Sequence, residues 1–172
     1  MSEEPVSEEP VGARADRPSM PEAYGLEGSA EGLLPWEWVT ERLRAARNYW
    51  VASTRPDGRP HCSPVWGIWL DGAIWFSTAR ATRKARNLTA NPETVVHLES
   101  GDEAVIVEGR IEEIADPSSL ERIAEPYAAK YGMRPPLEEP GNVLYALRPR
   151  RVLAWRESDF PKSATRWRFD AD

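Results

Sequence analysis

The sequence has very little cysteine and no long apolar run. Its one cysteine, Cys62, excludes an intrachain disulfide framework and a cysteine-cluster zinc site, and it fits a reducing cytoplasm. No apolar run approaches the roughly 18 residues that cross a bilayer. The first 20 residues lack the apolar core of a secretory signal. These absences predict a cytoplasmic protein without a metal site or a membrane partner.

Positive charge is also scarce in proportion to acid, and the imbalance is local. Residues 1–31 hold eight acids and two bases, which equals the whole formal charge of −6, and the remaining residues hold 20 acids and 20 bases. A neutral body lacks the basic footprint of a nucleic-acid-binding protein. Residues 1–30 are rich in Glu, Pro and Gly and have few apolar anchors. We therefore predict a disordered or loosely draped acidic tail over 1–30 and a single domain over 31–172.

Short strands separated by turn residues fill most of that domain. A helical apolar period covers 36–48, and the period then changes to that of strands, with Asp71-Gly72 as a hairpin signal. Two more helices are expected over 82–90 and 116–131. This pattern favours a small, mainly β (α+β) barrel with helices packed across its openings. The expected strands are 49–54, 59–70, 73–77, 94–98, 104–114, 143–147 and 152–155.

The most informative stretch is the strand-to-helix junction at 75–87. An apolar strand carries two hydroxyl residues, Ser77 and Thr78, to its end. Three residues later Thr82 is a good N-cap for the following helix. The junction therefore combines side-chain hydroxyls with the free N–H groups of a helix start, which is a common setting for an anion.

Cations lie at the same junction, where they are unfavourable without a partner. Arg80, Arg83 and Lys84 stand at the positive end of the helix dipole, at a cost of about 0.3–1 kcal/mol each. A bound phosphate ester would remove this conflict. The alternative is that all three side chains point into water, where surface charges cost little.

The junction resembles the pyridoxamine 5′-phosphate oxidase-like superfamily of flavin and deazaflavin split barrels. The resemblance covers about 36–156 and rests on Ser-Thr, then Thr-Arg-Lys-Ala, Asn-Leu and an Asn-Pro stop. It implies a split β-barrel of six to seven antiparallel strands, in which Ser77, Thr78, Arg83 and Lys84 hold the cofactor phosphate. It also implies that the strand at 57–66 runs along the cofactor ring. The cofactor-binding residues expected from the junction and this resemblance are Ser63, Pro64, Val65, Trp66, Ser77, Thr78, Arg80, Thr82, Arg83, Lys84 and Asn87.

The ring-side strand departs from the pattern of the true pyridoxamine phosphate oxidases. Those begin this strand with Arg and end it with Lys, whereas here the positions fall near His61 or Cys62 and near Trp66 or Gly67. The loss of both cations argues against a pyridoxal-type phosphate as substrate. The Ser-Pro-Val-Trp sequence is closer to the branch that uses deazaflavin F-420, although FMN users also occur.

Aromatic residues and histidines leave several alternatives open. Tryptophans at 66, 69 and 75 fit either core packing or stacking on a tricyclic ring, with Trp66 favoured for the ring. The two histidines, His61 and His97, are expected to lie beside the sheet with satisfied hydrogen bonds rather than to bind haem or metal. Trp155 and the run 163–168 could close the barrel or reach a partner's site.

Two functions follow from these observations. The first is an oxidoreductase in which bound deazaflavin F-420 or FMN exchanges a hydride with a small organic substrate, no side chain being assigned as acid or base. The second is a non-catalytic carrier of a flavin, haem or tetrapyrrole, because one fold hosts both. The resemblance further implies a homodimer with cofactor sites at its interface.

Overall fold

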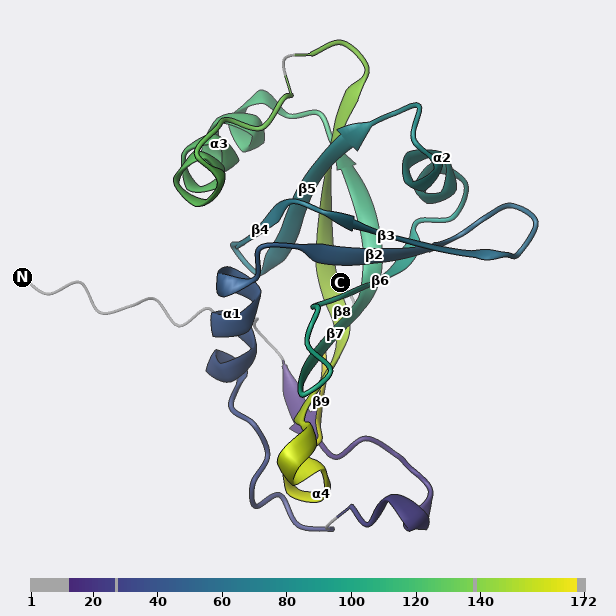
Figure 1. Cartoon of the computed structure of the whole chain (residues 1–172), viewed down its shortest axis with the longest axis vertical. Coiled ribbons are helices and arrows are strands. Elements are labelled where there is room, and N and C mark those ends of the chain that lie inside the picture. Colours follow the sequence, from purple (N-terminus) through teal and green to yellow (C-terminus); the bar gives the residue numbers. More distant parts are fainter. Residues whose placement is uncertain (1–12, 27, 138, 170–172) are drawn as a thin grey trace, which may run out of the picture.

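A single antiparallel sheet with flanking helices forms the described part of the chain, residues 13–26, 28–137 and 139–169 of the computed structural model (Figure 1). Four α-helices and nine strands occur within these residues. The helices are α1 (Trp36–Ala45), α2 (Arg83–Ala90), α3 (Pro117–Tyr131) and α4 (Phe160–Ser163). The strands are β1 (Arg14–Asp16), β2 (Tyr49–Thr54), β3 (Pro60–Val65), β4 (Gly67–Leu70), β5 (Ala73–Ala79), β6 (Glu93–His97), β7 (Glu103–Ile114), β8 (Asn142–Arg156) and β9 (Thr165–Arg168).

The strands follow the order β1-β9-β8-β7-β6-β2-β3, and β5 branches from β8 and carries β4. Every pair is antiparallel, and β3 does not pair with β4 or β5, so the sheet curls without closing. The long strand β8 joins two arms of the sheet. Its first half pairs with β5, which begins one arm, and its second half pairs with β9, which begins the other. This arrangement is the split β-barrel that the sequence predicts.

The core lies inside the curled sheet and under two helices. The larger cluster packs Val39 and Leu43 of α1 against the inner face of the strands, where Val51, Val96 and Val107 are fully buried. A smaller cluster forms beneath α3, around Ile68, Trp75 and Ile123. In Figure 1, α2 and α3 lie on opposite sides of β5. The last three residues of β5 are less buried than the rest of the strand: Ser77 and Thr78 are half-buried and Ala79 is exposed.

Two strand boundaries differ from the sequence-based prediction. The stretch 59–70 is two strands, since the ladder with β2 ends at Val65 and the ladder with β5 begins at Gly67. The separate strands expected at 143–147 and 152–155 are one strand, β8, because a bulge opposite Glu108 and Gly109 absorbs the Arg-Pro-Arg-Arg stretch between them.

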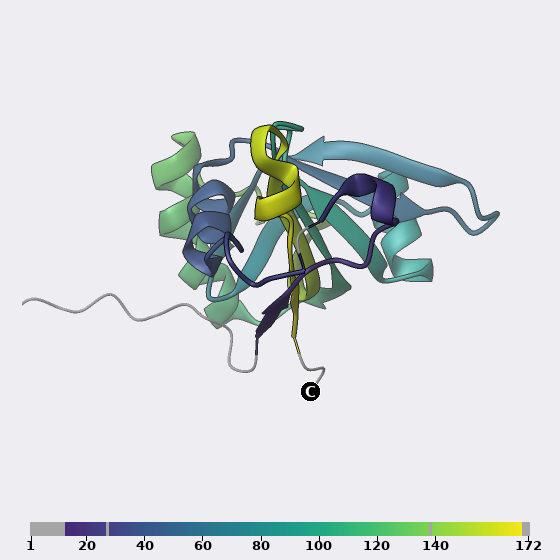
Figure 2. The same cartoon turned by 90° about the horizontal axis from the view of Figure 1, so that it is seen from below.

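The prediction of a disordered tail is wrong for the part of 1–30 that forms β1. Arg14–Asp16 pairs with β9, another strand that the sequence did not predict, and Figure 2 shows the two side by side. The reason is a set of specific polar contacts rather than apolar burial. Asp16 accepts from Arg166 at 2.7 Å, and Arg17 donates to the carbonyls of Lys162, Ala164 and Glu31. Residues 1–12 lie outside the described residues.

Within the described ranges no helix is both long enough and apolar enough to span a bilayer.

Candidate functional site

The junction between β5 and α2 brings two hydroxyls and one ammonium together. The Thr82 side chain caps α2 by accepting from the Ala85 N–H at 3.3 Å. Its Oγ1 also lies 3.3 Å from Thr78 Oγ1, and Lys84 Nζ donates to the same Thr78 oxygen at 3.4 Å. Lys84 therefore folds back over the start of its own helix, as expected of a residue that binds an anion there.

Lys84 carries a charge that its surroundings do not neutralise. No carboxylate of the described residues lies within ion-pair distance of its Nζ, and partial burial lowers the pKa of its ammonium. Arg83 beside it is exposed. A phosphate placed against Thr78 would supply the missing negative charge to both side chains.

Arg80 differs from the other two cations because it already has a partner. Its NH1 donates to Glu113 Oε2 on β7 at 2.9 Å, and its NH2 donates to the other carboxylate oxygen of Glu113 at 2.5 Å. The same contact holds the pKa of the Glu113 carboxyl below its usual range. Arg80 is thus directed to β7, whereas Lys84 is directed to Thr78.

Several buried polar atoms behind this junction have no partner among the described residues. Asn87 of α2 is fully buried and donates to Ser53 Oγ at 3.1 Å, but its own Oδ1 is unpaired. Ser63 Oγ and His61 Nδ1 on β3 are also buried and unpaired. Both point inward, because their register partners on β2 are the buried residues Val51 and Ser53. A buried unpaired polar group costs about 1–3 kcal/mol, so this cluster favours a polar ligand.

Cations surround His61 from two elements. Burial lowers the pKa of its imidazole, and the charges of Arg55, Lys84 and Arg83 lower it further. The nearby carboxylate Asp57 lies in the same turn as Arg55 but pairs with Arg59 at 2.8 Å. The residues between β3 and α2 therefore fit a phosphate-bearing cofactor in both charge and hydrogen-bonding capacity.

Trp66 lies at the other end of β3, in the break before β4. It is 39% exposed, and one ring face stacks on Tyr131 of α3, with centroids 4.8 Å apart and planes within 7°. The Tyr131 hydroxyl accepts from the Gly67 N–H at 2.9 Å, which fixes the break. Ser63, Pro64 and Val65 lead from the unpaired His61 to this stacked pair along one strand. The predicted ring-side residues thus run from Ser63 to Trp66, toward the end of β3 that meets α3. The predicted phosphate-side residues of α2 lie near the other end of β3, at His61.

Sequence reasoning missed Arg55, His61, Lys130 and Tyr131 as site residues. Lys130 of α3 donates to the Gly67 carbonyl at 3.1 Å and to the Tyr49 hydroxyl at 3.2 Å, and burial lowers its pKa to about 8. A cation therefore stands near Gly67, where the ring-side strand itself lacks one. The sequence does not show that Lys130 lies near Gly67, because this contact depends on the packing of α3 against β4. For His61, the sequence did hold a signal. His61 and Ser63 alternate along one strand and so face the same side, and the start of the helix at 83–90 is cationic.

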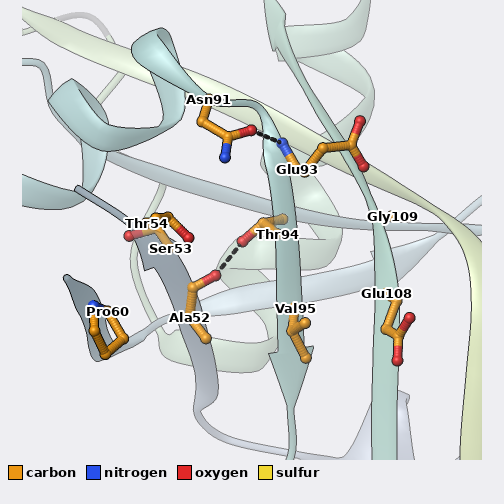
Figure 3. Close-up of a pocket in the computed structure, with 10 residues that line it drawn as sticks. All are labelled: Ala52, Ser53, Thr54, Pro60, Asn91, Glu93, Thr94, Val95, Glu108 and Gly109. Carbon is orange, nitrogen blue, oxygen red and sulfur yellow. Dashed lines mark hydrogen bonds between the residues drawn. The ribbon is translucent and has the colours of Figure 1, made fainter. Parts of the chain in front are cut away.

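A hollow of about 330 Å³ lies where β2 and β6 diverge (Figure 3), and Ser53 borders both this hollow and the site described above. None of the predicted site residues lines it. Its two carboxylates are paired, Glu93 with Arg150 at 3.2 Å and Glu108 with Arg151 at 2.5 Å. Without a free cation it does not suit a phosphate, and we keep the candidate site at the β5–α2 junction. The lining residues are Ala52, Ser53, Thr54, Pro60, Asn91, Glu93, Thr94, Val95, Glu108 and Gly109.

Comparison with known proteins agrees with the fold. The family model described as pyridoxamine 5′-phosphate oxidase matches residues 36–156. A conserved hypothetical protein, Rv2991 from Mycobacterium tuberculosis, is 26% identical with a TM-score of 0.64, over 72% of this chain and 85% of its own. An F420 reductase is 23% identical with a TM-score of 0.55, over 65% and 93%. A putative pyridoxamine 5′-phosphate oxidase from Listeria innocua is 17% identical with a TM-score of 0.52, over 63% and 87%.

No curated protein matches the sequence. The last two structures share the fold at low identity, and the family model spans most of the domain, including both β3 and the β5–α2 junction. The chain belongs to the pyridoxamine 5′-phosphate oxidase family.

Proposed function

We propose that the protein is an oxidoreductase that holds a flavin-type cofactor, FMN or deazaflavin F-420, by its phosphate at the β5–α2 junction. The observation that carries this proposal is the convergence of Lys84, Thr78 and Thr82 in front of buried, unpaired polar atoms. The bound cofactor would supply hydride transfer with a small organic substrate.

The chain's own residues would bind and orient that cofactor. The Lys84 ammonium and the Thr78 hydroxyl would hold the phosphate oxygens, with Arg83 adding charge from the exposed side. The Ser77 hydroxyl would not take part, because Ser77 alternates with Thr78 along β5 and shares the face of Trp75 and Leu144. Along β3, the segment from Ser63 to Val65 would support the cofactor. Trp66, held flat by Tyr131, would limit where the ring lies and shield it from water.

We also propose a homodimer that brings the cofactor sites to a shared interface. The register of the sheet aligns one row of residues across its outer face, namely Pro64, Trp50, His97, Ile106 and Leu153. Pro64 is exposed and the other four are half-buried, and Trp50 stacks on His97. An apolar row of this kind on a sheet face is typical of a surface that packs against a second copy.

The compartment proposed for this function is the cytoplasm. The single thiol, on Cys62, is exposed and would stay reduced there.

Fluorescence titration with FMN and, separately, with deazaflavin F-420 tests the cofactor proposal. We expect saturable binding of one of them and about tenfold or greater weakening in the double variant Arg83→Ala/Lys84→Ala, because a hydrogen bond to a charged group contributes about 1.5–3 kcal/mol. Arg86→Ala is the matched control, since Arg86 is an exposed cation of the same helix that donates to the Ala81 carbonyl.

Two results of the titration would reject the phosphate site, and a turnover assay on the loaded protein separates the two functions. Equal affinity of wild type and double variant would reject the phosphate site, and so would equal affinity for FMN and riboflavin, which lacks the phosphate. Tight binding without reduction of any added acceptor would favour the alternative function, a non-catalytic carrier of a flavin, haem or tetrapyrrole.

A further inference from the structure

His61 is the one histidine that faces the β5–α2 junction. It is placed there by the pairing of β3 with β2, which sets His61 opposite Ser53, and Ser53 in turn accepts from Asn87 of α2. The His61 Nδ1 is buried and has no hydrogen-bond partner among the described residues. The other histidine, His97, faces the outer side of the sheet, and its Nδ1 lies 2.8 Å from the Leu98 carbonyl oxygen.

Three cations act on His61, and a nearby carboxylate, Asp57, interacts with two of them, Arg55 and Arg83. Arg55 acts on it from the turn after β2, and Arg83 and Lys84 act on it from α2. The acidic group of that turn, Asp57, is held by Arg59 through two contacts to the guanidinium, at 3.0 and 2.8 Å. The β3 neighbour Cys62 points to the opposite face of the strand, so it does not balance these charges. His61 is therefore an unpaired imidazole within a group of three cations.

We infer that His61 is a further ligand of the cofactor phosphate, and that it binds the anion in its protonated form, taking up a proton as the phosphate enters. This inference rests on the proposed function and adds to it a residue and a coupling to pH.

The direction of the coupling follows from the charges. In the free protein the three cations and burial depress the pKa of His61, so the imidazole is neutral near pH 7. A phosphate dianion beside the ring favours the charged form and raises that pKa. Phosphate binding is therefore accompanied by the uptake of one proton on His61. The affinity that His61 adds is fully present below its pKa in the free protein and is lost as the pH rises through its pKa in the complex.

Proton NMR of the imidazole signals tests this inference directly, because the chain has only two histidines. His61→Gln and His97→Gln assign the two signals. Titrations from pH 5 to 9 are then run on the free protein and with FMN, deazaflavin F-420, riboflavin or inorganic phosphate added. We expect a phosphate-bearing probe to move the His61 midpoint to higher pH, riboflavin to leave it in place, and His97 to be unaffected.

A second measurement uses affinity. For the cofactor that binds, His61→Gln should lose about tenfold in affinity at pH 6 and little at pH 8, while the control Arg86→Ala should match wild type at both. Calorimetry in two buffers of different ionisation heat should find proton uptake at pH 7 in wild type and not in His61→Gln. Circular dichroism checks that the variant is folded.

The inference is overturned if no phosphate-bearing probe moves the His61 midpoint, or if riboflavin moves it as far as FMN does. The proposed function fails separately, when neither FMN nor deazaflavin F-420 binds in the fluorescence titration. A protein that binds FMN through Lys84 with an unchanged His61 midpoint would keep the proposed function and reject the role of His61.

Discussion

At the scale of single residues, the polar groups without partners distinguish the site from the rest of the surface. Several exposed cations have a carboxylate within reach, as Arg80 has Glu113 and Arg151 has Glu108. Lys84 and the imidazole of His61 lack one among the described residues. Since buried polar groups are usually satisfied in folded proteins, a cluster of exceptions points to a ligand.

Lys130 gives a prediction about pH and stability. Its pKa is about 8 in the folded protein against 10.5 for an ordinary lysine, because burial penalises its charge. Between pH 8 and 10 the Lys130 side chain therefore binds more protons in the unfolded chain, so this residue contributes a rise in the free energy of unfolding with pH over that range. Cys62 and the buried tyrosines contribute with the opposite sign, so the prediction concerns the difference between wild type and a variant without Lys130. Lys130→Met should abolish this rise, as measured by urea unfolding at fixed protein concentration.

The control for that experiment is Lys162→Met, which removes an exposed lysine from α4 and should keep the rise. Burial also raises the pKa of Tyr49, the hydrogen-bond partner of Lys130, so Tyr49 stays protonated in the folded state throughout this range. A free energy of unfolding that changes with pH from 8 to 9.5 in the same way in wild type and in Lys130→Met would contradict the prediction.

At the scale of elements, two irregularities in the strands shape the molecule. The break at Trp66 turns β3 into β4, and Tyr131 and Lys130 of α3 hold it by binding Gly67. The bulge at Glu108 and Gly109 lets β7 follow β8 along its full length and so joins the two arms of the sheet. Both irregularities have a glycine where another chain segment comes very close.

The bulge predicts a specific glycine requirement. A Cβ on Gly109 would lie 2.3 Å from the Arg148 carbonyl oxygen, which is backbone and cannot move aside easily. Gly109→Ala should therefore lower the free energy of unfolding by about 1–3 kcal/mol in urea denaturation. Gly101→Ala is the control, because a Cβ there meets nothing within 4 Å. Equal unfolding midpoints for the two variants would show that the bulge relaxes without cost.

At the scale of the whole molecule, the outer face of the sheet is the surface best suited to a second copy. Its apolar row crosses β3, β2, β6, β7 and β8, and Arg166, paired with Asp16, ends it on β9. An apolar centre with a charged rim is the usual composition of such interfaces.

If the proposed dimer forms through this row, Trp50→Glu should convert it to a monomer in sedimentation experiments, since a charge at the centre of the row would be desolvated in the interface. Tyr24→Glu, which places the same charge on an aromatic residue that is 55% exposed elsewhere, should stay dimeric. A folded Trp50→Glu protein that sediments as wild type does would place any interface on another face.

The fold class was predictable from the sequence because strand spacing, turn residues and caps are local properties. The strand at 49–54, the helix starts at Thr82 and Asp116, and the Asp71-Gly72 turn all lie where the pattern indicates. The strands β1 and β9 were missed because they are only three and four residues long, and β1 is joined to β9 by ion pairs across about 150 positions in the chain.

The sequence alone determined the phosphate-side half of the candidate site, since Thr78, Thr82 and Lys84 are within seven consecutive residues and a strand-to-helix junction places them together. Only the tertiary structure decided that Arg80 pairs with Glu113, that His61 and Arg55 join the cationic group, and that Lys130 reaches Gly67. Those contacts depend on strand register and helix packing between segments far apart in the chain, and no local pattern encodes them.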